Sequence, residues 1–330
     1  MKETLAVLVQ KFLNSGSSNM NWILLAVAAQ FLNALVVLID KHIVTDEKVI
    51  MRPFVYAYYT CLISGVWISV FLIGLLPFSF GGVQLPSLAN VIRPTLEVVA
   101  LSFLAAYTFF TGLVSMFTAL KESDASNVIP VIGATSAVAS FGLGYLFLNA
   151  ELSHNFMLGI VLLSIGTFLV SRFHFSYKVA LIAVHAGIFF ALHYVSIKGL
   201  FLVTSFDNAF FWSRAALMFY VLSLLLVPSF LEKIQKHSDT ATRKTGYLIL
   251  SSKVLAGVST ILILKATDLG DVAVVQALGG LQFVFILLFG IFFSMHPSKI
   301  KAGEVYRHET ILQKALFVAV ITIGFLVLFK

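Results

Sequence analysis

Apolar runs of about twenty residues recur along almost the whole chain. An α-helix rises about 1.5 Å per residue, so a run of this length spans the roughly 30 Å hydrocarbon core of a lipid bilayer. Hydrophobic residues make up 59% of the 330 residues and charged residues only 11%, whereas soluble domains carry about 25% charged residues. The sequence therefore predicts an all-α polytopic membrane protein.

Ten of these runs are predicted to cross the membrane. They cover approximately residues 21–40, 53–78, 96–119, 125–148, 155–171, 178–200, 207–228, 246–264, 271–293 and 310–329. Most connections between them are short, which favours antiparallel neighbouring helices. Residues 1–20 have a short apolar segment without a convincing cleavage site, so they are predicted to form an interfacial lead-in rather than a signal peptide.

Two similar polar segments, which we call the clasps, divide the chain into halves. The first clasp, Leu120-Lys121-x-Ser123-Asp124, is matched by the second, Leu264-Lys265-x-Thr267-Asp268, at a shift of 144 residues. Further matches occur in the same order: Ala34-Leu35 with Ala191-Leu192, Lys41 with Lys198, and Ile165-Gly166 with Ile323-Gly324. They predict two five-helix repeats, residues 21–172 and 173–330. Because five crossings are an odd number, the second repeat would be inverted, an arrangement found in many transporters.

The segment ALKESDASNVIPVIGATSAVASFGLGYLFLNAELS, followed by LGIVLLSIGTFLV, resembles the EamA-like family of the drug/metabolite transporter superfamily. In that family a polar hairpin precedes a helix rich in proline and small residues, then an acidic residue and a helix with spaced glycines. The matching residues are Pro130, Gly133, Glu151, Gly159 and Gly166. The second half departs from this pattern, with Val274 in the place of Pro130 and Phe317 in the place of Gly159. The resemblance implies a transporter with a central cavity lined by spans 1, 3, 4, 6, 8 and 9.

The orientation of the chain in the membrane is predicted differently by two criteria. Lys and Arg are more numerous in the loops on the side opposite the two termini, which by the positive-inside rule places both termini outside the cytoplasm. The family resemblance implies cytoplasmic termini instead. The expected location is the plasma (inner) membrane, and either a monomer or a homodimer fits the sequence.

Two basic residues lie deep within predicted spans. Lys253 lies in span 8, and Arg214 lies in span 7 close to Trp212. A charge in hydrocarbon is unfavourable by about 2.5–3.5 kcal/mol on insertion scales, so each charge indicates a function or a partner. They are candidates for a cationic lining that binds an anionic or carboxylate-bearing substrate. A structural ion pair, or an arginine extending to the interface, is the alternative.

Polar side chains also recur on single faces of predicted helices. Gln30, Asn33 and Asp40 share one face of span 1, while Gln276 and Gln282 lie in span 9 beside two glycines. These amides are candidates for substrate binding, although hydrogen bonds between helices would explain them equally well. Asp40 adjoins Lys41 at the predicted membrane boundary, where neutralising that neighbour is its expected role.

Aromatic and imidazole side chains supply further candidates. Tyr56 in span 2 and Tyr107 in span 3 are candidates for the cavity wall. His185 and His193 lie on roughly one side of span 6 and could carry protons if transport is proton-coupled, since histidine titrates near neutral pH. A hydrogen-bonded core position is the other interpretation of each histidine.

The remaining charged residues of the clasps are predicted to cap helix ends. Lys121 and Lys265 stand where helices end, and Asp124, Asp268 and Asp271 where helices begin, so each charge suits its end of a helix dipole. Pro130 is predicted to kink its helix. Since Asp268 and Asp271 stand three residues apart on one helix, they do not form the facing carboxylates of an aspartyl protease.

No sequence motif indicates an enzyme, a cofactor or a metal site. The chain has no Walker loop, no HExxH and no nucleophile elbow. Its single cysteine, Cys61, excludes a cysteine-based metal cluster. The net charge of +7 comes from residues in the short connections rather than from one basic stripe, so no nucleic-acid partner is expected.

The sequence thus favours a secondary transporter or exporter of a small polar metabolite that works by alternating access. Its expected partners are an unknown small-molecule substrate and the lipid bilayer. A flippase for a lipid-linked head group is the first alternative, because apolar walls and cationic residues would suit such a substrate. A non-transporting membrane scaffold is the second, and it predicts a packed centre with Lys253 fully paired and no cavity.

Overall fold

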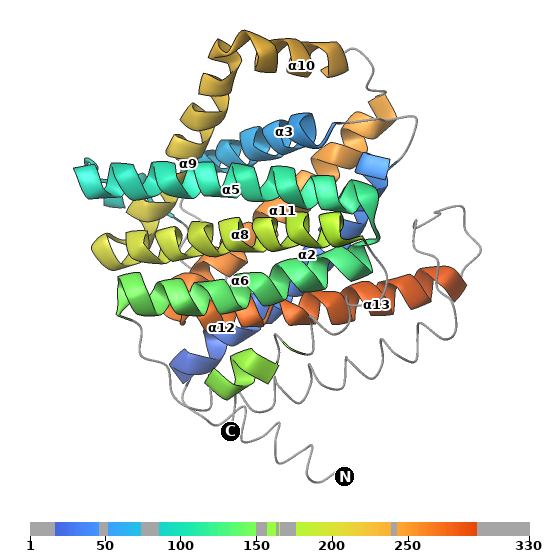
Figure 1. Cartoon of the computed structure of the whole chain (residues 1–330). Coiled ribbons are helices and arrows are strands. Elements are labelled where there is room, and N and C mark those ends of the chain that lie inside the picture. The colour runs from blue at the N-terminus through green and yellow to red at the C-terminus, as the bar shows by residue number, and fades with distance from the viewer. Residues whose placement is uncertain are drawn as a thin grey trace.

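The described part of the chain is a bundle of helices (Figure 1). The computed structural model describes residues 17–45, 52–73, 86–149, 157–162, 165, 176–238 and 243–295. Within these ranges the chain forms helices and connecting turns and no strand. The longer helices are α2 (Ser17–Thr45), α3 (Pro53–Val66), α5 (Leu96–Glu122), α6 (Ala125–Leu148), α8 (Tyr177–Val203), α9 (Phe206–Ser223), α10 (Pro228–Ser238), α11 (Arg243–Leu269) and α13 (Gly280–Met295). The shorter ones are η1 (Trp67–Ser69), α4 (Val70–Ile73), η2 (Leu88–Asn90), η3 (Leu224–Leu226) and α12 (Val272–Ala277).

The predicted spans agree with the described helices. Seven helices in the described ranges are long and apolar enough to cross a membrane: Trp22–Thr45, Pro53–Leu72, Leu96–Glu122, Ala125–Leu148, Tyr177–Val203, Phe206–Leu226 and Gly246–Leu269. A shorter apolar helical stretch covers Val272–Ile286. Span 155–171 is described only at 157–162 and 165, and span 310–329 and most of the lead-in 1–20 lie outside the described residues. The all-α class is confirmed, whereas the ten-helix, two-repeat arrangement stays a prediction.

Two groups of helices pack against each other. Helix α8 packs between α5 and α6, and α9 covers α5 and α3 (Figure 1). Helix α2 packs along α11 and also touches α13, while α12 lies on α6. The helix α10 forms in the connection predicted after span 7 and lies at one edge of the bundle (Figure 1). Segments from both halves of the chain are therefore interleaved around one centre.

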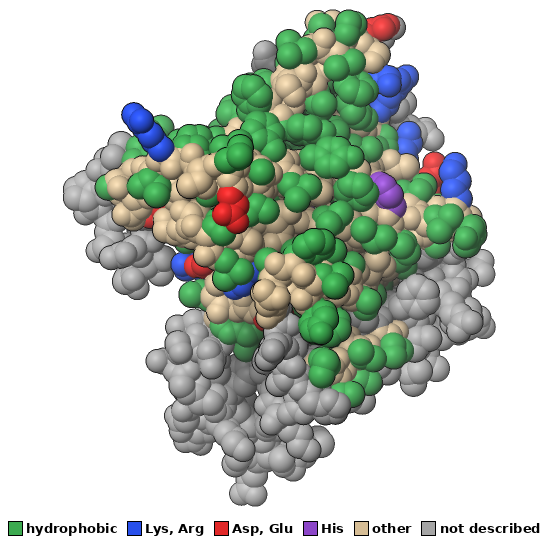
Figure 2. All heavy atoms as spheres, turned by 60° about the vertical axis from the view of Figure 1, so that its left-hand side comes forward, with side chains coloured by type: hydrophobic (Ala, Val, Ile, Leu, Met, Phe, Trp, Pro, Cys, Tyr) green, Lys and Arg blue, Asp and Glu red, His purple; other side chains and the backbone are tan. Residues whose placement is uncertain are grey.

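The outer surface is apolar, as a bilayer requires. Figure 2 shows hydrophobic side chains spread over the described part of one face, with few charged side chains among them. Exposed large hydrophobic residues on the long helices include Leu104 and Phe103 on α5, Leu181 on α8 and Phe219 on α9. Exposed apolar area of this extent marks contact with membrane or protein rather than with water. The protein is an integral membrane protein.

Each clasp receives a lysine from another helix. Lys41 Nζ on α2 donates to the carbonyl oxygens of Leu120 at 2.7 Å and Ser123 at 2.8 Å. Lys198 Nζ on α8 donates to the carbonyls of Thr267 at 2.9 Å, Asp268 at 3.0 Å and Gly270 at 2.8 Å. The last carbonyls of a helix lack intrahelical partners and form the negative end of its dipole, so an ammonium group stabilises them. The matched lysines in the sequence therefore make matching contacts, at opposite ends of the bundle (Figure 1).

The first clasp differs in detail from its prediction. Lys121 lies exposed in the last turn of α5, while the lysine on α2 reaches the carbonyls at this helix end. Asp124 occupies the position directly before α6, as predicted, but its side chain makes no capping hydrogen bond. Its backbone carbonyl accepts from the amides of Asn127 at 3.0 Å and Val128 at 3.1 Å. The polar groups of the helix ends at this turn are thus bonded by the backbone and by Lys41.

The second clasp confirms one predicted cap and corrects another. The Asp271 carboxylate accepts from the backbone amides of Ala273 at 2.7 Å and Val274 at 3.3 Å, so it caps α12 as predicted. Asp268 lies inside the last turn of α11 instead of at a helix start. It accepts from Lys265 Nζ at 2.8 Å, because the helix continues further than the sequence indicated.

Replacing Lys198 by methionine is expected to lower the free energy of unfolding by about 1 kcal/mol, because the carbonyls at the end of α11 lose their cation. Thermal unfolding of the purified protein in detergent would measure the change. Lys178→Met on the same helix is the control, since Lys178 is exposed. Equal midpoints for the two variants would contradict a stabilising role for Lys198.

Candidate functional site

A cavity of about 170 Å³ lies at the centre of the bundle. It is lined by residues of α2, α3, α5, α6, α8, α11, α12 and α13. An engineered protein cavity of about 150 Å³ holds a benzene molecule, so this one has room for a small molecule. The polar lining residues are Gln30, Asn33, Asp40, Thr60, Ser64, Ser136, Lys253, Thr260, Gln276 and Gln282. Every helix that the family resemblance implied contributes to the lining, and α3 does so in addition.

Amide side chains on both sides of the cavity are held by serines. Ser259 Oγ on α11 lies 2.7 Å from Asn33 Oδ1 on α2. Ser136 Oγ on α6 donates to Gln276 Oε1 on α12 at 3.1 Å. The hydrogen bond from the serine hydroxyl orients each amide, and the amide nitrogen stays able to donate to a bound molecule. The cavity therefore presents fixed hydrogen-bonding groups from several helices.

The helix that carries two of these amides is interrupted. Helix α12 ends at Ala277 and α13 begins at Gly280, so Gln276 and Gln282 flank the break. A side chain at Gly133 on α6 would meet the backbone of Gly279 at 4.0 Å, so the two segments approach closely. Irregular backbone inside a membrane is tolerated where protein buries it or a cavity adjoins it. Helices broken beside a cavity occur in transporter binding sites. Here backbone hydrogen bonds continue through the break, with the Gly279 amide donating to Gln276 at 3.0 Å and the Gln282 amide to Gly279 at 3.1 Å.

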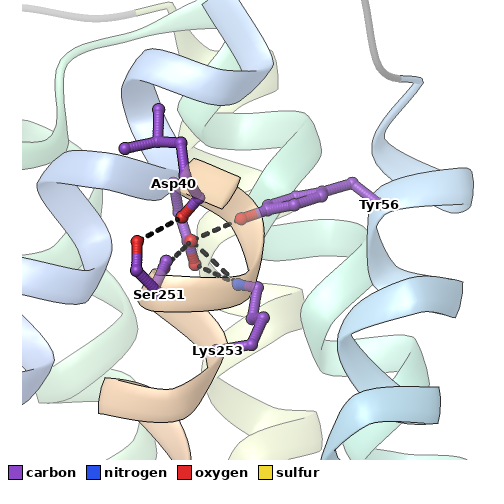
Figure 3. A network of polar contacts seen from close by, with 6 residues as sticks. Asp40, Tyr56, Ser251 and Lys253 are labelled. Atoms are coloured by element: carbon purple, nitrogen blue, oxygen red, sulfur yellow. Dashed lines mark hydrogen bonds and ion pairs between the residues drawn. The ribbon is translucent and has the colours of Figure 1, made fainter. Parts of the chain in front are cut away.

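A buried ion pair lies at the edge of the cavity (Figure 3). Lys253 Nζ on α11 lies 2.8 and 3.0 Å from the two carboxylate oxygens of Asp40 on α2. Tyr56 Oη on α3 donates to the same carboxylate at 2.5 Å, and Ser252 Oγ does so at 3.0 Å. The ammonium group also lies 4.4 Å from the centre of the Tyr56 ring. This network joins three helices around one neutralised charge.

The ion pair corrects two predictions. Lys253 lines the cavity as predicted, but its charge is balanced by Asp40 and does not stand free for a substrate. Asp40 pairs with Lys253 instead of the adjacent Lys41, whose ammonium group binds the first clasp. Successive residues of a helix point about 100° apart, so Asp40 and Lys41 face different neighbours.

Six predicted residues lie outside the cavity lining: Tyr56, Tyr107, His185, His193, Trp212 and Arg214. Arg214 is buried on α9, with its guanidinium 5.5 Å from the centre of the Phe210 ring. Trp212 Nε1 donates to the carbonyl of Ile92 at 3.0 Å, which ties the segment before α5 to α9. Tyr107 is exposed on α5, so its predicted place in the cavity wall is not observed.

The two histidines form hydrogen bonds between α8 and α5. His193 Nδ1 lies 2.8 Å from the carbonyl of Ala105, and because a carbonyl only accepts, this nitrogen carries the proton. His185 Nδ1 lies 2.9 Å from Ser115 Oγ near the surface. Neither histidine lines the cavity. The hydrogen-bonded interpretation of His193 agrees with this geometry, and proton coupling through either residue stays a prediction.

Part of the cavity lining was not predicted from the sequence, although the spacing of its polar residues indicates it. Thr60 and Ser64 on α3 stand four residues apart, so they share the face that meets the cavity. Lys253 and Thr260, seven residues apart on α11, share a face in the same way. The apolar wall comes from Phe109, Leu113, Met116, Ile129, Ile132, Phe190 and Tyr194, among others. Such residues look like any other lipid-facing or core positions in so apolar a sequence.

The helix α6 brings Ile129, Gly133 and Ser136 to the cavity and contains Pro130 in its first turns. Proline lacks the backbone N–H that would complete the helical hydrogen bond at this turn. A kink at this residue stays a prediction. In the ranges that the structure describes, no three His, Cys, Asp or Glu side chains lie close enough together to hold a metal ion.

These features define a polytopic helical membrane protein with a buried polar cavity between interleaved helices. Residues 20–172 match the model of the EamA-like transporter family. The matched model describes a family of membrane transporters. The resemblance read from the first half of the sequence is confirmed.

Solved structures support the fold over a longer range. Among the 28 chains of solved structures that match, one crystal structure of a protein is 14% identical in sequence, with a TM-score of 0.60. The alignment covers 95% of this chain and 96% of that chain. At this identity the likeness concerns the fold alone. A comparison with curated proteins gives no match.

Proposed function

We propose that the protein is a secondary transporter that moves a small polar metabolite across the membrane by alternating access to the central cavity. The observation that carries the proposal is the cavity itself, lined by amides and hydroxyls in the middle of an apolar bundle. Buried polar groups without a function are unfavourable in a membrane, and they recur along substrate pathways. The interrupted segment between α12 and α13 supports the same interpretation.

The energy source is a solute or ion gradient, since the sequence contains no nucleotide-binding motif. The two alternatives have less support. A non-transporting scaffold would need no cavity, yet one is present beside the paired Lys253. A flippase would need an opening from the cavity to the lipid, and no feature of the described lining favours a lipid tail over a small polar guest.

Cysteine labelling tests alternating access directly. Cys61 is buried and is the chain's only cysteine, so Cys61→Ala gives a background without thiols. We expect Ser136→Cys in this background to react with a membrane-impermeant thiol reagent applied to either side of a proteoliposome. Because Ser136 lines the cavity, each inward or outward opening would expose it in turn. The readout is the labelled fraction from each side separately.

A matched control lies one turn further along the same helix. Ser140 on α6 is buried but outside the cavity lining, so Ser140→Cys should stay unlabelled from both sides. Reaction of Ser136→Cys from one side only would contradict alternating access, and no reaction from either side would contradict transport through this cavity. A reagent confined to the bilayer distinguishes the flippase, since only an opening to lipid would let it reach Ser136→Cys.

A further inference from the structure

Arg214 is a buried cation that has no acidic partner among the residues the structure describes. Its side chain is 2% exposed, and its Nε has no hydrogen-bond partner. Among the described residues, no carboxylate lies within ion-pair distance of its guanidinium. Its charge is therefore uncompensated within the described protein.

The guanidinium borders a narrow recess beside the central cavity. Ser64 on α3 and Thr260 on α11 line both spaces, so the recess and the cavity are direct neighbours. Trp67 and Gly257 form another part of the recess wall. In this conformation the recess is too narrow for a water molecule.

An unpaired charge in a dry interior is strongly unfavourable, and apolar residues of similar size would stabilise the fold better. The ring of Phe210 supplies one cation–π contact, which compensates a charge only in part. A guanidinium offers a planar, forked set of donors that fits carboxylate and phosphate groups. A mobile anion is the partner that such a group would bind.

The other cation near the cavity does not fill this role. Lys253 is held by both oxygens of Asp40, so the pair adds no net charge to the lining. Any preference of the cavity for anions therefore depends on Arg214. The two basic residues that looked alike in the sequence differ in the structure: Lys253 has a carboxylate partner, and Arg214 has none within the described part of the chain.

We propose that Arg214 is the anion-binding residue of this transporter, and that it receives the carboxylate or phosphate group of a small organic anion when the recess widens toward the cavity. The inference rests on the proposed transport function and narrows its substrate class. Ser64 and Thr260 stand between the two spaces, where their hydroxyls can bond an anion that bridges them.

Matched ligand pairs test the charge requirement on the unmodified protein. Thermal unfolding of the purified full chain would be followed with lactate against lactamide and with glycerol phosphate against glycerol, at ionic strength equalised with chloride. We expect at least one anion of these pairs to raise the unfolding midpoint, while its uncharged counterpart leaves the midpoint unchanged. Stabilisation by lactate alone would indicate a carboxylate substrate, and by glycerol phosphate alone a phosphate substrate. If neither anion stabilises more than its counterpart, the inference is wrong.

Substitutions then test Arg214 itself. Arg214→Gln should weaken binding of the stabilising anion by about 10- to 100-fold, the loss expected for one hydrogen-bonded charge. Arg214→Lys should retain part of the effect because it keeps the charge, and it also serves if the glutamine variant fails to fold. Lys265→Gln, which removes a cation outside the cavity lining, should leave the anion effect intact.

A purely structural arginine would behave differently. Arg214→Gln would then change the midpoint of the ligand-free protein, while the anion would still raise it by the wild-type amount; that result would overturn the inference. The labelling of Ser136→Cys separates this failure from failure of the transport proposal. Labelling from both sides without any anion effect would leave transport standing and reject only the role of Arg214.

Discussion

Replacing Lys253 by methionine is expected to lower the free energy of unfolding by about 3–5 kcal/mol. The variant leaves the Asp40 carboxylate buried without its cation, and only the bonds from Tyr56 and Ser252 remain to it. Both members of the pair are almost completely buried, so water would not replace the missing charge without structural change. Unfolding by titration with an anionic detergent in mixed micelles would measure the loss.

Combining substitutions of Asp40 and Lys253 separates the effect of the ion pair from the effect of leaving one charge unpaired. Asp40→Asn alone should also be strongly destabilising, because it leaves the ammonium group unpaired. Asp40→Asn combined with Lys253→Met removes both charges and should recover most of the lost free energy, since an uncharged pair of similar volume carries no desolvation penalty. If the effects of the two single variants simply add in the double variant, the two residues are not coupled and the ion pair does not stabilise the fold.

The ion pair also connects the two halves of the chain. Asp40 lies on α2 and Lys253 on α11, and these two helices pack along each other beside the cavity. Under alternating access, one set of helices moves relative to another around the site. A stable α2–α11 contact would therefore belong to one moving unit, while helices that meet the cavity through weaker polar contacts would move relative to it.

Much of the fold was predictable because the bilayer imposes simple rules. Length and hydropathy alone located the seven described helices that are long and apolar enough to cross a membrane, and the repeated clasps marked matching turns. The amides Gln30, Asn33, Gln276 and Gln282 were predicted as cavity residues, and all four line the cavity. Polar side chains in an apolar helix have few permissible places, so their sequence positions carry strong information.

Pairing between distant helices was not predictable in the same way. Nothing local in the sequence links Asp40 to Lys253, or Lys198 to the carbonyls of the second clasp. Lys41 and Lys198 were recognised as matching residues. Every residue has a backbone carbonyl, so the sequence does not indicate which carbonyls a lysine binds, and the role of the two lysines was not predicted. Tyr107 and His185 were misplaced because helical position alone does not tell whether a mildly polar aromatic group faces lipid, interface or cavity.

Replacing Gly257 by alanine is expected to destabilise the protein by about 1–3 kcal/mol, the usual effect of adding a carbon atom to a packed interior. A Cβ atom at this position of α11 would overlap the indole ring of Trp67, so the ring rests directly on the helix backbone. The ring must move, and since both residues line the recess of Arg214, the recess must change shape with it. The same micelle titration would report the loss of stability.

The same helix provides the control for this substitution. A Cβ atom at Gly246 on α11 would meet nothing within 4 Å, so Gly246→Ala should be neutral or stabilising by up to about 1 kcal/mol through helix propensity. Trp67→Ala removes the indole ring. In that background Gly257→Ala should lower the free energy of unfolding by less than it does in the protein with the intact indole. Similar effects of Gly257→Ala and Gly246→Ala would mean that Trp67 does not press on α11. The indole would then not fix the shape of the recess, and the anion would have to reach Arg214 without moving this ring.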